Sequence, residues 1–321
     1  MESSTRMARK MAALADLGFQ RVDPAPLPVE TTPVSRGRCK VTSRQPSMGT
    51  LVSVTAVHES SALIQEATGV AFLEMERVVN LLNRYDPTSA LSFLNVEGGL
   101  GDPPPELLAV LWQSRYFYQA SQGAFDPTVQ PLVDLFRNGA SQGIRPGVGP
   151  GSMPPPETEP PTEAQVNEAL ALVDGSRVEI GENGIRLSSP EMGVTLDGIA
   201  KGYVVDRMAS VLADQGLRDF LIDAGGDIRT SGTREDGLPW QVGVQDPKKQ
   251  GDLPDIIGLS GGAVATSGSY EIYFDRDRTY HHIVSAGTGA SPNLSQSVSV
   301  LAPTTLAADA LATAAFVMGP E

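Results

Sequence analysis

Short apolar runs with strand spacing and longer runs with helical spacing follow one another irregularly along this chain of 321 residues. Apolar residues recur at helical spacing over residues 62–83, and a second such pattern, over 106–121, follows three prolines. Further helices are expected over 163–173, 198–215 and 305–318. Strands are expected over 50–57, 177–180, 184–188, 220–223, 240–244, 256–259, 263–266, 270–274, 280–284 and 297–301. This mixture predicts an α+β fold with mixed sheets and flanking helices.

Two segments lack any sustained hydrophobic period. Residues 1–46 are mixed in charge and rich in Pro, Ser and Thr, which predicts a poorly ordered leader before a folded region over 47–321. Residues 138–162 are dense in Gly and Pro. On composition alone this second segment is either a linker between two domains or a long loop inside one, because lengthening a loop costs little closure entropy.

Charge and composition exclude several classes of protein. The 24 Lys and Arg against 38 Asp and Glu leave a net charge of -14, which argues against nucleic acid as a partner because such affinity comes mainly from neutralising phosphates. The single cysteine, Cys39, excludes a disulfide framework and a multi-cysteine zinc site, and the three histidines are too few and too scattered for a zinc triad. No stretch is long and apolar enough for a membrane span and no export signal is visible, so we expect a cytoplasmic protein.

Two segments have the chemistry to hold a phosphate and a metal ion. The run from Asp197 through Gly198 to Lys201 opens a helix, where free N–H groups and the helix dipole favour anions; the alternative is an ordinary solvated helix start. Asp309 and Thr313 stand four residues apart on one helix face, and both offer the hard oxygen ligands that suit Mg²⁺. Alternatively, Thr313 bonds back to its own helix and Asp309 favours the helix dipole.

Three further segments carry weaker signals. Strand alternation sends His281 and His282 to opposite faces, so at most one enters a site; there it could act as a general base, the alternative being a structural histidine. The paired glycines at 225–226 permit either a tight turn or close approach to a ligand. Phe125 and Asp126 could pack on a planar ring and accept from its edge nitrogens, or they form a plain turn.

Taken in chain order, several motifs resemble the FAD:protein FMN transferase family, the ApbE-like flavin transferases. The matching segments are 47–50, 83–87 with Ser89 and Asn95, 123–131, 195–206, 223–232, 265–268, 282–289 and 298–319. Each segment is weak alone, whereas their number and order make the match specific. The resemblance implies an ApbE-like (T-fold-like) single catalytic domain, with residues 138–162 as an internal loop.

The resemblance also implies a reaction. Enzymes of this family bind FAD in an extended cleft, bridge its pyrophosphate with Mg²⁺, and move FMN through a phosphoester bond onto a Ser or Thr hydroxyl, releasing AMP. The implied partner is an acceptor flavoprotein or a redox-complex subunit. The positions that match the family's FAD contacts are Met48, Tyr85, Ala124, Phe125, Asp126, Thr195, Lys201 and Val284. Asp309 and Thr313 match its side-chain Mg²⁺ ligands, Gly198 its carbonyl ligand, and His282 its candidate catalytic histidine.

The chain departs from the family pattern at two points. The family often has Asp where this chain has Thr195, which can still hydrogen-bond a flavin or ribose edge, and Asp197 follows two positions later. After His282 the family usually carries Asp-Pro, but residues 285–286 are Ser-Ala. Two alternatives therefore stay open: a pyrophosphatase that splits FAD into FMN and AMP, and a FAD-binding protein without catalysis. Family members are often periplasmic or membrane-anchored, and no such signal is visible here.

Overall fold

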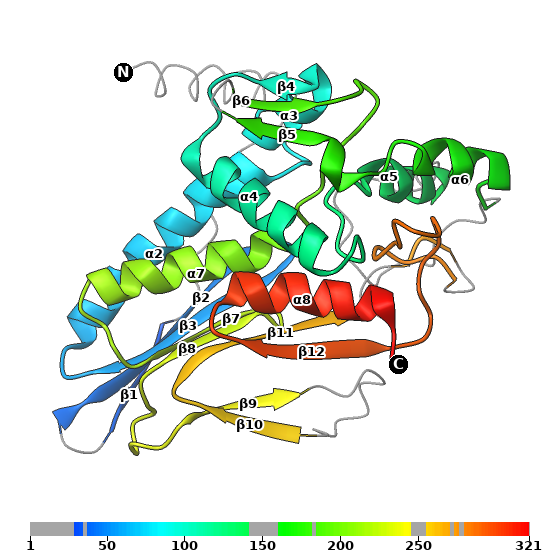
Figure 1. The fold of residues 1–321 in the computed structure, drawn as a ribbon. Helices are drawn as coiled ribbons and strands as arrows, with labels where there is room; N and C mark the ends of the chain where they lie inside the picture. Colours follow the sequence, from blue (N-terminus) through cyan, green and yellow to red (C-terminus); the bar gives the residue numbers. More distant parts are fainter. Residues whose placement is uncertain are drawn as a thin grey trace, which may run out of the picture.

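A seven-stranded antiparallel sheet lies at the centre of the computed structural model, which describes residues 29–34, 37–140, 160–181, 184–244, 255–269, 273–275 and 279–320. The strand order is β1 (Glu30–Pro33), β2 (Cys39–Ser47), β3 (Thr50–His58), β7 (Phe220–Ala224), β8 (Ile228–Ser231), β11 (Gly261–Gly268) and β12 (Ser297–Ala302) (Figure 1). Buried and less buried residues alternate along β7 and most of β3, so one face of the sheet carries the core.

Three helices cover that face (Figure 1): α2 (Ser61–Leu82), α7 (Ala200–Asp214) and α8 (Thr305–Met318). Helix α2 contacts α7, α7 contacts α8, and α8 lies on β11 and β12. The core between helices and sheet is made of fully buried side chains, among them Val54, Met75, Ile222 and Met208. Helix α4 (Pro105–Ala120) contacts both α2 and α8 from outside.

The first turns of α7 and α8 are held together closely. A Cβ at Gly202 would lie 2.5 Å from the carbonyl oxygen of Thr305, so only glycine admits this approach. The carboxylate of Asp206 accepts hydrogen bonds from the backbone N–H groups of Thr305 and Leu306, each at 2.9 Å, and satisfies two free donors of α8. The start of α8 is therefore set by side chains and backbone of α7.

Smaller units surround this body. A second sheet has the order β4 (Gly99–Leu100), β6 (Gly184–Leu187) and β5 (Val178–Gly181), beside helix α3 (Ala90–Glu97) and a 3-10 turn, η2 (Gly175–Arg177). Helices α5 (Gln130–Ala140) and α6 (Glu163–Leu170) contact each other, and Leu132, Val133, Phe136, Phe274 and Val284 form a second apolar cluster. Strands β9 (Trp240–Val244) and β10 (Asp255–Leu259) form a separate two-stranded ribbon.

The α+β prediction is confirmed, and helix α8 and strand β9 have the predicted bounds. Three expectations differ from the structure. Residues 30–33 and 39–46, expected in a loose leader, form strands, because β2 pairs with β3 over its whole length across the turn at 48–49. Helices α3 and α5 and strands β4 and β8 were not predicted. Around 280–284 the described residues show only an isolated bridge, between Tyr273 and His281.

Three sequence expectations fall mainly outside the described residues. Residues 1–28 of the expected leader and 141–159 of the Gly/Pro-rich segment are among the positions not described. The expected strand over 270–274 is described only at its last two residues. Within the described ranges, no helix has both the length and the apolar character needed to cross a bilayer.

Glu74 ties three helices together. Its carboxylate accepts from Arg77 of α2, which also pairs with Glu106 of α4, and from Arg207 of α7 at 2.9 Å. These arginine hydrogen bonds lower the pKa of Glu74 from 4.5 to about 2, against the opposing effect of burial. The folded-state pKa lies below the unfolded value, so this contribution to stability is present above pH 4.5 and is lost as the pH falls toward 2.

We expect Glu74→Gln to lower the free energy of unfolding at pH 7 by about 1 to 2 kcal/mol, since Arg77 is half exposed and its pairing is screened. Urea unfolding at several pH values measures this difference, which should narrow between pH 4.5 and 2. Glu66→Gln, at an exposed site of the same helix, is the control. An equal loss in both variants, or a loss independent of pH, would contradict the assignment.

Candidate functional site

A pocket opens where one side of α8 meets four loops and the end of β11. It encloses about 810 Å³, including space open to solvent. The predicted site residues that line it are Ala124, Phe125, Asp126, Thr195, Gly198, Lys201, His282, Val284, Asp309 and Thr313. They come from segments as far apart in the chain as residues 124 and 313, on both sides of the Gly/Pro-rich segment. The two remaining predicted contacts, Met48 and Tyr85, do not line the pocket.

Side-chain oxygen atoms of Asp309, Thr313 and Ser267 lie close together in one corner of the pocket. A Cβ at Gly198 would lie 2.9 Å from the Thr313 Oγ1, so glycine lets the backbone come close to this hydroxyl. Ser267 Oγ of β11 lies 3.3 Å from the same Thr313 Oγ1. Asp309, one turn before Thr313 on α8, is buried and accepts from the Gly202 N–H at 3.0 Å. A carboxylate, a hydroxyl and a nearby backbone are hard oxygen donors of the kind that Mg²⁺ prefers.

The electrostatics of this corner fit a cation. Burial raises the pKa of Asp309 from 3.8 to about 6, although the charge of Lys201 and the Gly202 N–H act in the opposite direction. A buried carboxylate with a raised pKa is stabilised in its charged form by a bound cation. Within the described part of the chain, no three His, Cys, Asp or Glu side chains gather to hold a metal, so any ion here would rely on neutral oxygens beside Asp309.

Lys201 stands in the first turn of α7, beside this corner. Its Nζ lies 3.5 Å from the carboxylate of Asp227, which is buried and also lines the pocket. Asp227 directly follows the paired glycines, whose φ angles of +69° and +98° make a tight turn at the end of β7. A helix start with a lysine pointing at a pocket favours anionic ligands. Asp227 was missed in the sequence analysis, where only the glycines before it were singled out.

The loop 124–129 forms another wall of the pocket. Phe125 is buried, and its ring meets Phe117 of α4 edge-on. Asp126 is occupied by its own loop, because Oδ1 accepts from the Thr128 N–H and hydroxyl and Oδ2 accepts from the Gly175 N–H. Burial raises the pKa of Asp126, and the hydrogen bonds from Thr128 partly oppose this. These bonds order the loop and leave little of the carboxylate for a ligand.

The two adjacent histidines have different roles. His281 is buried, its Nε2 lies 2.8 Å from the Pro292 carbonyl oxygen, and its Nδ1 accepts from the Ile283 N–H at 3.3 Å. Burial lowers the pKa of His281, so its ring stays neutral near pH 7. His282 is the one that lines the pocket. The prediction that only one of the two enters a site therefore agrees with the structure, although these residues do not form a regular strand.

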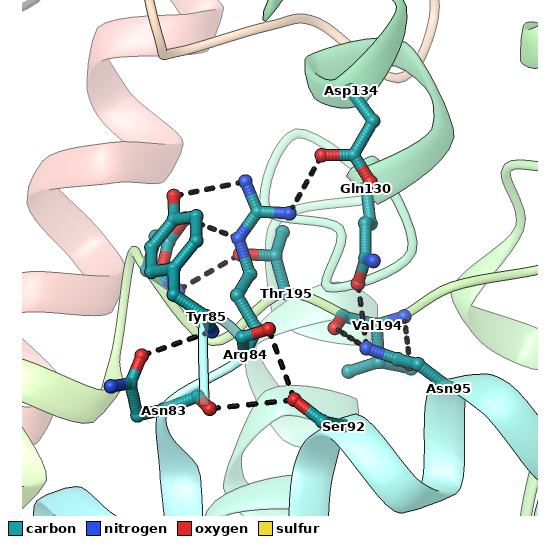
Figure 2. A network of polar contacts seen from close by, with 10 residues as sticks. Asn83, Arg84, Tyr85, Ser92, Asn95, Gln130, Asp134, Val194 and Thr195 are labelled. Atoms are coloured by element: carbon teal, nitrogen blue, oxygen red, sulfur yellow. Dashed lines mark hydrogen bonds and ion pairs between the residues drawn. The ribbon is translucent and has the colours of Figure 1, made fainter. Parts of the chain in front are cut away.

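Tyr85 lies outside the pocket and is joined to its wall by Arg84 (Figure 2). Arg84 donates to the Tyr85 hydroxyl at 3.0 Å, and its guanidinium lies 4.6 Å from the ring centroid. The guanidinium of Arg137 lies 4.5 Å from the same centroid. Met48 is in the β2–β3 turn with a φ of +50° and packs partly against the main core. Neither residue touches the pocket as it stands.

Asn95 supports the pocket from behind (Figure 2). Its Oδ1 accepts from the Val194 N–H at 2.8 Å, and its Nδ2 donates to the Val194 carbonyl at 2.9 Å and to Gln130 Oε1 at 2.7 Å. This clamp fixes the backbone directly before Thr195, and Thr195 Oγ1 in turn accepts from the Asp197 N–H. The orientation of the 195–198 segment, and with it the backbone at Gly198, therefore depends on a side chain from α3.

We expect Asn95→Asp to lower the melting temperature by several degrees, because an isosteric carboxylate keeps the bond from Val194 N–H but loses both donated bonds. The rise in melting temperature on adding Mg²⁺ should shrink as well, since Gly198 would be less well held. Thermal unfolding with and without Mg²⁺ measures both effects. Asn167→Asp, on the exposed side of α6, is the control. A melting temperature unchanged by Asn95→Asp would contradict the claim that Asn95 holds the backbone at Val194.

Comparisons with known proteins point in one direction. A family model described as the ApbE family matches residues 48–321. The FAD:protein FMN transferase of Vibrio cholerae is 31% identical over 283 residues, which cover 86% of this chain and 80% of that protein. The FAD:protein FMN transferase of Treponema pallidum is 32% identical over 269 residues, covering 78% of this chain and 70% of that protein.

Solved structures agree with the sequence relatives. The ApbE protein of Thermotoga maritima superposes with a TM-score of 0.75 at 30% identity and covers 87% of each chain. The flavin transferase ApbE of Vibrio cholerae superposes with a TM-score of 0.71 at 28% identity, covering 92% of this chain and 89% of that one. These superpositions confirm the predicted ApbE-like fold.

Proposed function

Because this chain belongs to the ApbE family, we propose that it is an FAD:protein FMN transferase that depends on Mg²⁺. It would move FMN from FAD onto a Ser or Thr hydroxyl of an acceptor flavoprotein or redox-complex subunit and release AMP. One observation carries the proposal: a single pocket brings together the oxygen atoms of Asp309 and Thr313, the helix start at Lys201, and His282. Asp309 and Thr313 can bind a cation, the helix start at Lys201 can bind an anion, and His282 can act as a base.

Phosphoryl transfer relies mainly on positioning and charge neutralisation. The acceptor oxygen forms a bond to the FMN phosphorus while the bond from that phosphorus to the AMP phosphate breaks. His282 is proposed to take the hydroxyl proton, as a histidine beside a phosphate is suited to do. Lys201 and the N–H groups at the start of α7 would hold the negative charge of the diphosphate.

Three groups of this chain are proposed to hold the ion: the carboxylate of Asp309, the hydroxyl of Thr313 and the carbonyl of Gly198. Bound Mg²⁺ supplies Lewis-acid neutralisation of the developing charge. Ala124, Phe125, Thr195 and Val284 would contact FAD as walls of the pocket, with Asp126 acting chiefly through its loop. Met48 and Tyr85 do not line the pocket, so in this proposal they contact a part of FAD that extends outside it.

Mass spectrometry tests the proposal directly. The protein is incubated with FAD, Mg²⁺ and a candidate acceptor, a redox-complex subunit of the same organism, with EDTA in place of Mg²⁺ as the control. We expect the acceptor to gain the mass of one FMN group and AMP to appear only with Mg²⁺. Free FMN and AMP with an unmodified acceptor would indicate the pyrophosphatase instead. FAD that is bound and unchanged under both conditions would overturn both enzymatic functions.

A further inference from the structure

An arginine is enclosed behind the pocket wall between two carboxylates. The side chain of Arg84 is only 3% exposed and meets Asp134 of α5 on one side (Figure 2). On the other side it meets Asp197 of the pocket-lining segment. Its Nη1 lies 3.0 Å from Asp134 and its Nε lies 3.1 Å from Asp197. Two carboxylates and the Tyr85 hydroxyl thus surround one guanidinium, and each of its three nitrogens donates to one of them.

The two carboxylates differ in what they face. Asp197 lines the pocket, between Thr195 and Gly198, and half of its side chain is exposed. Asp134 does not line the pocket. An unneutralised charge at Asp197 would repel any diphosphate in the pocket, and this repulsion would add to that of a chain with a net charge of -14. Arg84 offsets that charge from behind without entering the pocket; since it is shared with Asp134, the three groups together keep one negative charge.

Hydrogen bonds hold the backbone around Arg84 so that its side chain stays in contact with Asp197. Ser92 of α3 donates to the Arg84 carbonyl oxygen at 3.0 Å, and the Tyr85 N–H donates to Asn83 Oδ1 at 3.0 Å. The segment after α2 is therefore fixed to α3, and Arg84 reaches Asp197 from a rigid support. An arginine in such a position acts through its partner and not on the ligand itself.

We propose that Arg84 is a positioning residue that neutralises and orients Asp197, so that this wall of the pocket accepts the diphosphate of a dinucleotide. The inference rests on the proposed function for the identity of the ligand, and on the Arg84 contacts for the role of the residue. If Arg84 has this role, its loss weakens the binding of a phosphate-bearing flavin more than the binding of a neutral flavin.

Binding assays on four proteins test this: the wild type, Arg84→Met, Asp197→Asn and the double variant. Flavin fluorescence gives the Kd for FAD and for riboflavin, which lacks phosphate. We expect Arg84→Met to weaken FAD binding about 10-fold or more at low salt and riboflavin binding less than about 3-fold. Added salt should shrink the FAD effect. Asp197→Asn in the Arg84→Met background should restore FAD binding to within about 3-fold of the wild type.

A matched double variant separates charge from structure. Asp134→Asn also removes an Arg84 partner, but from outside the pocket, so it should not rescue FAD binding in Arg84→Met. Equal loss of FAD and riboflavin binding, rescue by both asparagines, or rescue by neither would overturn the proposal. If Arg84→Met does not fold, Arg84→Gln, which also removes the positive charge, replaces it in the same four-protein scheme. Wild-type protein that fails to bind FAD at all would instead count against the proposed function.

Discussion

Asp309→Asn should reduce Mg²⁺-dependent transfer by about 1,000-fold or more while making the metal-free protein more stable at pH 7. The first effect follows because the proposed site has one carboxylate, whose removal takes away the charge that holds the ion and its contribution of several kcal/mol. The second follows from burial, which raises the pKa of Asp309 to about 6. At pH 7 the metal-free protein must keep a buried charge, and asparagine removes that requirement while its Oδ1 can still accept from Gly202.

The pH dependence has a defined sign. Asp309 has a folded-state pKa above its ordinary 3.8, so the folded state binds more protons and metal-free stability falls as the pH rises from about 4 through 6. We expect Asp309→Asn to raise the melting temperature in EDTA by a few degrees at pH 7 and to leave it almost unchanged at pH 4. Added Mg²⁺ should stabilise the wild type and have no effect on the variant.

Asp214→Asn, at the exposed end of α7, serves as the control and should match the wild type in every assay. Two results would remove Asp309 from the cation site. One is a variant that keeps the wild-type rate with Mg²⁺. The other is a variant that is still stabilised by Mg²⁺ to the wild-type extent.

The spacing of apolar residues predicted helices and strands well wherever the apolar positions are also the buried ones. Helix α8 was predicted with its observed bounds because Thr304 caps it and Gly319 ends it. Strand β2 was missed because Val41 is its only fully buried large apolar residue, and pairing with β3 supplies the rest of its stability. Helix α5 was missed because its buried Leu132, Val133 and Phe136 precede the Gly/Pro-rich segment, whose composition dominates the local pattern.

The candidate site could be predicted only through motifs in chain order. Spacing alone relates Asp309 to Thr313, since both lie on one helix, but it does not bring Gly198 beside Thr313. That contact depends on the close packing of α7 on α8 at Gly202, a tertiary feature with no local signal. Arg84 lies in the matching segment 83–87, but the sequence assigns it no role, because its partner Asp197 is more than a hundred residues away.

His282→Ala should lower the rate of FMN transfer by about 100-fold to 10,000-fold, the usual contribution of a general base. FAD binding should change by less than about 3-fold, because His282 is proposed to act on the acceptor proton and not on the dinucleotide. Single-turnover mass spectrometry gives the transfer rate, and flavin fluorescence gives the Kd for FAD, so that the two effects are measured separately. Raising the pH should partly restore the rate of the variant, since the acceptor hydroxyl then loses its proton to hydroxide more readily.

The neighbouring residues make this test selective. His281→Ala is not a suitable control, since that ring is buried and bonded to Pro292 and would disturb the whole segment. His58→Ala is suitable, because His58 is the last residue of β3, at the end of that strand away from the turn at 48–49, and does not line the pocket. A parallel loss of transfer and FAD binding in His282→Ala would assign His282 to binding. Transfer at the wild-type rate would leave the base to be found among the other pocket-lining carboxylates, which include Asp197 and Asp227.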